Sequence, residues 1–266
     1  MQTWTEHDAA AHIAVPTEHD EKYSRGVLGM VTGSDEYPGA AVLGVEAALR
    51  TGVGMVRYVG TDRPTSLVLQ RRPEIVAGMG KVQAWLIGSG TTGDDKDSKH
   101  ARAALAEGVP VVIDAGALEM HTDRQGPVVL TPHAGELARL LDVPRETILD
   151  DPGTWATKAS EMLHATVLLK GHTTYAAGPG IQLAARSAPT WLATAGAGDV
   201  LAGILGALVA THATEIAEDE RMLARLAATA SVLHGLAADR AGRGGPVTML
   251  DVAAAVSPTI AALLTP

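Results

Sequence analysis

The chain has 266 residues, of which 21 are lysine or arginine and 30 are aspartate or glutamate, so its formal net charge at pH 7 is −9. Hydrophobic residues make up 46% of the chain and charged residues 19%, a balance that supplies a core and argues against a disordered chain. The sequence contains no cysteine, which excludes disulfides and thiolate metal sites, and its acidic balance argues against a nucleic-acid partner.

The first 25 residues are polar and show no clear periodicity, so we expect an arm or a short helix at residues 1–25. They contain no apolar stretch typical of a signal peptide, and no apolar run in the chain approaches the roughly 20 residues of a membrane span. We therefore expect a cytoplasmic protein with no membrane partner.

From residue 26 onward, short apolar runs alternate with longer segments of helical pattern. The runs predict buried strands at residues 27–31, 53–59, 84–87, 109–113, 128–130 and 166–169. The longer segments predict helices at residues 39–50, 100–107, 135–141, 155–164, 199–212, 219–241 and 249–264, and residues 174–193 predict short strands and turns. This alternation is typical of an α/β protein with a mostly parallel central sheet covered by helices on both faces. We expect residues 26–266 to form a single domain.

Polar and glycine-rich clusters follow four of the predicted strands, at residues 88–93, 114–116, 131–136 and 170–174. In open parallel sheets, ligands bind outside the carboxyl ends of the strands. The sequence therefore predicts a site along this edge. Within it, Asp114 can bind a ribose or a metal-bound water, or cap a turn.

The small-residue segment 193–199, ATAGAGD, leads directly into a predicted helix. Small residues let backbone amides approach an anion closely, and the start of a helix adds unpaired amides and a positive dipole end. The segment therefore predicts a phosphate site in which Asp199 accepts a proton from a hydroxyl held against the phosphate. The alternative is that Asp199 only caps the helix.

The segment 131–136, TPHAGE, places His133 and Glu136 three residues apart, so both can face one site if a helical turn begins there. Glu136 can hold a water bound to Mg²⁺, because that ion usually keeps its waters and binds through few carboxylates. His133 can hydrogen-bond a substrate. The alternative is a capping arrangement with a structural histidine.

Lys170 stands at the end of a predicted strand and is followed by Gly171. A lysine in that position can reach a phosphate group. The alternative is an ordinary exposed lysine in a turn.

Four segments occur in chain order: 37–41 (YPGAA), 130–136 (LTPHAGE), 170–173 (KGHT) and 196–203 (GAGDVLAG). Together they resemble the ADP/ATP-dependent NAD(P)H-hydrate dehydratases of the ribokinase-like superfamily, from about residue 22 to about residue 264. The last segment alone indicates the superfamily. TPHAGE indicates the dehydratases, because sugar and vitamin kinases of this fold more often have Asn at the position of His133. The resemblance implies a three-layer ribokinase-like fold.

The resemblance also implies an activity: a lyase that restores NADH or NADPH from the S-epimer of the hydrated coenzyme. ADP or ATP would be consumed, and AMP or ADP would be released with phosphate. Contacts to the hydrated nicotinamide nucleotide would come from Ala40, Gly90, His133 and Asp199, with Asp199 as the catalytic base. The adenine nucleotide would be held by Lys170, Gly171, His172, Thr173, Thr174, Gly196 and Gly198. Mg²⁺ is the implied cofactor, and a homo-oligomer, often a tetramer in relatives, is the implied assembly.

Two positions depart from the family pattern. Gly116 stands where the family often has a second acidic residue after the strand-end Asp. Thr91 and Thr92 stand in the glycine-rich loop where an apolar residue is expected, which leaves both Gly90 and Gly93 as candidates for the substrate contact.

Two other functions are compatible with the same residues. A small-molecule kinase of this fold, acting on a vitamin precursor or a sugar, would use the same loop at 196–199 and would release a stable phosphorylated product. A nucleotide-binding sensor without catalysis would bind ADP and not turn it over.

Overall fold

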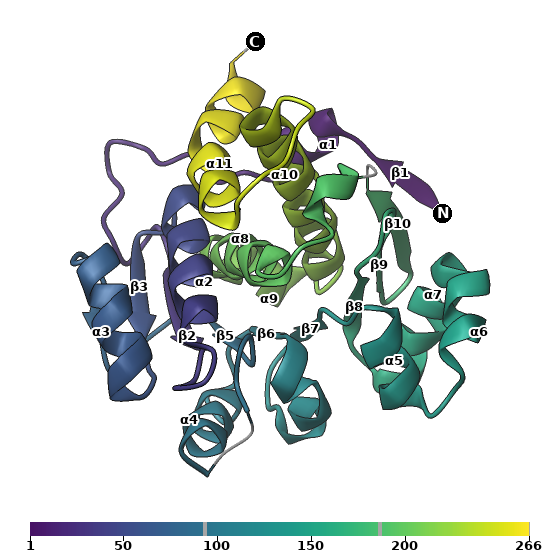
Figure 1. Cartoon of the computed structure of the whole chain (residues 1–266), viewed down its shortest axis with the longest axis horizontal. Helices are drawn as coiled ribbons and strands as arrows, with labels where there is room; N and C mark the ends of the chain where they lie inside the picture. The colour runs from purple at the N-terminus through teal and green to yellow at the C-terminus, as the bar shows by residue number, and fades with distance from the viewer. Residues whose placement is uncertain (93–94, 186–187, 266) are drawn as a thin grey trace.

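The computed structural model describes residues 1–92, 95–185 and 188–265. Within these residues, ten strands form one sheet in the order β1-β10-β9-β8-β7-β6-β5-β2-β3-β4 (Figure 1). The seven strands from β8 to β4 in this order are parallel to one another, β9 is antiparallel to both β8 and β10, and β1 is parallel to β10. The mostly parallel sheet expected from the sequence is therefore confirmed.

The bounds of the elements follow the apolar runs closely. The strands are β1 (Gln2–Trp4), β2 (Val27–Val31), β3 (Met55–Tyr58), β4 (Val76–Ala77), β5 (Ala84–Ile87), β6 (Val111–Ile113), β7 (Val128–Leu130), β8 (Thr166–Leu169), β9 (Thr174–Gly178) and β10 (Ile181–Ala185). The helices are α1 (Glu6–Ala10), α2 (Pro38–Thr51), α3 (Asp62–Arg71), α4 (Asp95–Leu105), α5 (Ala134–Leu141), α6 (Arg145–Asp150), α7 (Pro152–Leu163), α8 (Ala197–Thr211), α9 (Ala213–Glu218), α10 (Met222–Gly242) and α11 (Met249–Leu264), with 3-10 turns η1 (Ala115–Asp123) and η2 (Thr190–Leu192).

Helices cover both faces of the sheet, as Figure 1 shows. Alternate residues of a strand point to opposite faces, and β2 illustrates this. Its Leu28 and Met30 join the core beneath α2, α8, α10 and α11. Its Val27 and Val31 join the core beneath α4 and η1. A third cluster packs α5, α6 and α7 against β8 and β9. The three layers expected from the sequence are present.

Two glycines bring α2 and α8 into close contact. A Cβ atom on Gly203 would lie 2.3 Å from the carbonyl oxygen of Gly44, so any larger residue would push the helices apart. The contact also places the first turn of α8 beside α2, because a Cβ on Gly44 would lie 3.6 Å from the carbonyl oxygen of Asp199. The start of α8 is thereby fixed at the carboxyl edge of the sheet.

The N-terminal segment adds to the sheet. It contains α1, and its strand β1 pairs with β10, a strand that the sequence analysis did not predict. Trp4 of β1 is buried, and its indole nitrogen donates to Thr229 Oγ1 of α10 at 3.0 Å. Three residues are too few to show an alternating pattern, so this strand had no detectable sequence signal.

Four other elements were also missing from the prediction: the short elements β4, α6 and α9, and the ten-residue helix α3. The helix expected at 219–241 begins at Met222, since α9 ends at Glu218 and a turn separates the two. None of the helices in the described ranges is long and apolar enough to cross a membrane.

Candidate functional site

The polar residues singled out in the sequence meet at the carboxyl ends of the parallel strands. Gly90 follows β5, Asp114 follows β6, His133 follows β7 and Lys170 follows β8. An isolated parallel bridge pairs His133 with Lys170, and the Lys170 amide donates to the Pro132 carbonyl at 2.9 Å. The first turn of α8 lies against the same edge, because a Cβ on Gly198 would be 3.6 Å from Lys170 Nζ.

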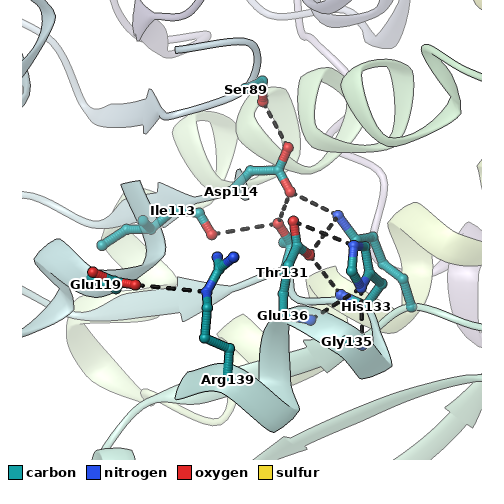
Figure 2. Close-up of polar contacts among 10 residues, drawn as sticks. Ser89, Ile113, Asp114, Glu119, Thr131, His133, Gly135, Glu136 and Arg139 are labelled. Carbon is teal, nitrogen blue, oxygen red and sulfur yellow. Dashed lines mark hydrogen bonds and ion pairs between the residues drawn. The ribbon is translucent and has the colours of Figure 1, made fainter. Parts of the chain in front are cut away.

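Lys170 is the centre of a group of charges (Figure 2 shows its carboxylate partners). Its Nζ lies 2.8 Å from Asp114 Oδ1 and 3.8 Å from Glu136 Oε2. Burial works to lower the pKa of Lys170, but the negative charges of Asp114 and Glu136 outweigh it and hold that pKa above its ordinary value. Lys170 is therefore a fixed cation, and the alternative of an ordinary exposed lysine is wrong, since only 18% of its side chain is exposed.

Asp114 is the buried anchor of this cation. Ser89 Oγ donates to its Oδ2 at 2.9 Å and Thr131 Oγ1 donates to its Oδ1 at 2.7 Å (Figure 2). Burial works to raise the pKa of Asp114, but the Lys170 charge and the hydrogen bonds from Lys170, Thr131 and Ser89 together keep it below its ordinary value. The carboxylate thus stays ionised and holds the ammonium in place.

His133 caps the N-terminus of α5. Its Nδ1 accepts from the amides of Gly135 at 3.0 Å and Glu136 at 3.1 Å, and Glu136 Oε2 accepts from the His133 amide at 2.8 Å (Figure 2). The expected capping alternative is therefore confirmed. An Nδ1 that accepts two amides carries no proton, so the proton of the neutral ring is on Nε2. That nitrogen lies 3.7 Å from Glu136 Oε1, beyond hydrogen-bond distance, on a side chain that is 59% exposed, so its N–H can donate to a ligand.

The start of α8 has the features of an anion site. Its N-cap is Gly196, whose φ of +89° is a left-handed conformation that favours glycine, and a Cβ there would lie 2.6 Å from Leu43 Cδ1. In the part of the chain that the structure describes, the amides of Gly198 and Asp199 have no backbone acceptor. Unpaired amides and the positive end of the helix dipole both favour an anion at this point.

Asp199 is the third residue of α8 and not its N-cap, so the interpretation of Asp199 as a simple cap is wrong. Burial and the nearby charge of Asp114 raise its pKa, the Lys170 charge lowers it, and the net pKa is about 6. Within the described ranges, no hydrogen bond satisfies its carboxylate. A free carboxylate with a pKa near neutrality is suited to accept a proton.

A cavity of about 710 Å³ opens beside this turn of α8. Of the residues expected to bind a nucleotide, five line it: Lys170, Gly171, His172, Thr174 and Gly198. Thr173 and Gly196 belong to the same two loops but do not line it. His133 also lines the cavity, so the histidine donor and the lysine cation face one space.

Ala40 and Gly90 form a second contact region on the α2 side of Asp199. Gly90 has a φ of +67°, and a Cβ on it would lie 2.4 Å from the Ala40 Cβ, so the Gly90 backbone lies directly against the Ala40 side chain. Gly93, the alternative to Gly90, lies outside the described residues. The structure therefore brings the predicted site residues together as two neighbouring groups, one on each side of the Asp199 turn.

The residues at the site fit a magnesium ion that is carried mostly by phosphates and water. Among the residues the structure describes, no group of three histidines or acids can hold a metal. Asp114, Glu136 and Asp199 surround the single Lys170 ammonium, so the negative charges exceed the positive charge. Mg²⁺ usually binds through one or two carboxylates together with substrate phosphates and waters.

Sequence reasoning missed some of the residues that build this site. It left the role of Asp114 open and did not single out Ser89, Thr131, Ser231 or His234. Ser231 and His234 of α10 line the cavity, although their helix is far from every polar cluster in the sequence. Their spacing of three on the mostly apolar central part of the helix was the available signal.

The comparisons with known proteins agree with this geometry. A family model described as NAD(P)H-hydrate dehydratase matches residues 28–256. The chain is 43% identical over 217 residues to the bifunctional NAD(P)H-hydrate repair enzyme Nnr of Mycobacterium tuberculosis. That match covers 77% of this chain and 45% of the relative, so the chain spans about half the length of that protein.

Solved structures match the whole chain. The ADP/ATP-dependent NAD(P)H-hydrate dehydratase of Bacillus subtilis, co-crystallised with ATP and Mg²⁺, has a TM-score of 0.89 at 25% identity and covers 98% of both chains. A ribokinase-like superfamily protein of Enterococcus faecalis has a TM-score of 0.87 at 22% identity, covering 100% of this chain and 97% of the other. The expected ribokinase-like fold is confirmed. The chain belongs to the NAD(P)H-hydrate dehydratase family.

Proposed function

We propose that this protein dehydrates the S-epimer of hydrated NADH or NADPH and consumes ADP or ATP in the reaction. The observation that carries the proposal is the unpaired Asp199 carboxylate, with a pKa of about 6, at the start of α8 beside Lys170 and the cavity. A proton acceptor next to an anion site is what phosphoryl transfer to an alcohol requires.

The first step transfers a phosphoryl group to the substrate. A hydrated dihydronicotinamide carries a hydroxyl on C6, and hydroxide is a poor leaving group. Asp199 takes the hydroxyl proton while the oxygen attacks the terminal phosphate of the nucleotide. The amides of Gly198 and Asp199 and the Lys170 ammonium stabilise the charge on the transferred group.

The second step expels the new phosphate group. The lone pair on the ring nitrogen N1 pushes out phosphate from C6, and loss of a C5 proton restores the double bond. The products with ADP are the reduced coenzyme, AMP, phosphate and one proton. A kinase-like site thus gives a lyase, because the phosphorylated intermediate collapses.

Other groups position the reactants. The Nε2 proton of His133 donates to the substrate, and Ala40 and Gly90 offer its ring a surface without protruding side chains. Lys170, Gly171, His172, Thr173 and Thr174 hold the nucleotide together with Gly196 and Gly198. Mg²⁺, when bound to the phosphates, supplies charge neutralisation, and Glu136 would hold it through a water molecule.

The experiment is a coupled optical assay. Purified protein is mixed with Mg²⁺, hydrated NADH or NADPH and either ADP or ATP, and the recovery of reduced nicotinamide absorbance is followed. Recovery that depends on a nucleotide, with phosphate released in equal amount, supports the proposal. A stable phosphorylated product would instead support the small-molecule kinase, and nucleotide binding without turnover would support the sensor.

The choices between ADP and ATP and between NADH and NADPH hydrate are made by comparing kcat/KM in that assay. A homotetramer and a cytoplasmic location are further proposals that rest on the family resemblance. Light scattering at several protein concentrations tests the assembly.

A further inference from the structure

His234 is a buried histidine with a ring nitrogen that no described residue satisfies. It lies in the middle of α10, its exposed fraction is 6%, and its Nε2 has no partner among the described residues. Burial lowers the pKa of His234 to about 4, so the ring is neutral at physiological pH and offers one N–H donor and one acceptor nitrogen. Buried polar atoms in native proteins are almost always satisfied, so an unsatisfied one at a cavity points to a ligand.

The histidine faces the cavity beside α8. Ser231 and His234 are three residues apart on α10, which puts them on one face of the helix, and both line the cavity. The same cavity is lined by Lys170 and Gly198, the cation and the helix start described above. The two polar regions therefore belong to one binding space.

The cavity wall around His234 is mostly apolar. It is formed by residues such as Ala188, Pro189, Leu192 and Leu201. A mostly apolar wall with only the neutral polar groups of Ser231 and His234 on its α10 side suits a flat heterocycle and does not suit a phosphate. Since the phosphates of a nucleotide bind at Lys170 and Gly198, the apolar part is left for the base.

We infer that His234 recognises the nucleobase of the adenine nucleotide through a hydrogen bond from its imidazole to the edge of the base. The inference deepens the proposed function and rests on it. Adenine offers the acceptors N1, N3 and N7 and the donor amino group on C6, and either tautomer of the neutral ring can pair with one of these.

The test combines His234→Leu with altered nucleotides, and ADP binding is measured by calorimetry without the hydrated coenzyme. We expect His234→Leu to weaken ADP binding about tenfold, the size of one buried hydrogen bond. The 1-deaza, 3-deaza and 7-deaza analogues of ADP and the N6-dimethyl analogue each remove one group of the base edge. One of these analogues should bind wild type about tenfold more weakly than ADP does. The same analogue and ADP should have equal affinities for His234→Leu.

The free variant should unfold at the same temperature as wild type or at a higher one, because leucine replaces an unsatisfied polar group. His212→Leu is the matched control: His212 is also buried, lies outside the cavity, and its Nδ1 is 2.9 Å from the Leu208 carbonyl oxygen. That control should lower the unfolding temperature and leave ADP affinity unchanged.

Equal ADP affinity of His234→Leu and wild type would overturn the inference. It would also be overturned if each analogue, compared with ADP, lost the same affinity in His234→Leu as in wild type. A variant that unfolds several degrees lower with unchanged affinity would show a structural role instead. If wild type itself binds no adenine nucleotide, the proposed function fails first, so the two failures are distinguishable.

Discussion

Replacing Asp199 with asparagine should make the free protein more stable while it removes activity. The carboxylate has no hydrogen bond in the described structure, and burial raises its pKa to about 6 from an ordinary 3.8. The folded state therefore disfavours the charged form that the reaction needs. An amide of the same shape carries no charge and avoids this cost.

The magnitude follows from the pKa. Each pKa unit corresponds to about 1.4 kcal/mol, so the rise from 3.8 to about 6 corresponds to about 3 kcal/mol. Because the side chain is partly open to solvent, we expect about 2 kcal/mol. The sign depends on pH: the cost is absent below pH 3.8, grows as the pH rises towards 6, and is complete above that value.

Denaturant unfolding at pH 4 and pH 8 measures this cost. Asp199→Asn should match wild type at pH 4 and exceed it by about 2 kcal/mol at pH 8. In the optical assay, wild-type kcat/KM should fall with pH below about 6, while the variant should be about 10²–10⁴-fold slower and lack this acid limb.

Asp62→Asn is the matched control, since Asp62 also lies in the first turn of a helix but is exposed. It should lose about 0.5 kcal/mol, because an acid there ordinarily favours the helix dipole. Equal stability of Asp199→Asn and wild type at pH 8 would show that the Asp199 carboxylate is not desolvated. Activity within a few fold of wild type would show that it is not the base.

Three further substitutions test the rest of the site. Lys170→Met should destabilise the protein by about 3 kcal/mol at neutral pH, because it leaves the buried Asp114 carboxylate without its cation. In denaturant unfolding this loss should shrink as the pH falls, because without the Lys170 charge burial favours the protonated form of Asp114, which needs no cation. His133→Asn should keep the cap and the unfolding temperature but raise KM for the hydrated coenzyme, since the Nε2 donor is lost; an unchanged KM would exclude the donor role. Gly90→Ala should raise the same KM, because its new Cβ would collide with Ala40. In that variant, KM for ADP should stay constant, and a parallel rise would mean that the whole loop has shifted.

The long apolar runs made most of the fold predictable. The strands β2 and β5 match the expected residues, and the buried helices α8 and α11 match within about two residues, because each carries an unbroken apolar pattern. Short elements such as β1 and α6 were not predictable. Their few residues form no period, and distant packing decides their structure.

The site residues at the strand ends were predictable, but the contacts between residues far apart in the sequence were not. Lys170 and Asp199 stood out because glycines and a helix start surround them in the sequence. The ion pair of Lys170 with Asp114 joins residues 56 positions apart, and no local pattern encodes such a pair. His234 was hidden for the same reason, since only the packing of α10 against the cavity gives it a role.

The strand β1 has a consequence for how the protein is made. Its three residues must wait for residues 183–185 of β10 before they can pair, and Trp4 must wait for Thr229. Contacts between such distant parts of a chain form slowly and tend to form late during folding. In a growing chain that has reached only residue 180, residues 2–4 are therefore already synthesised, but the residues of β10 with which they pair are not.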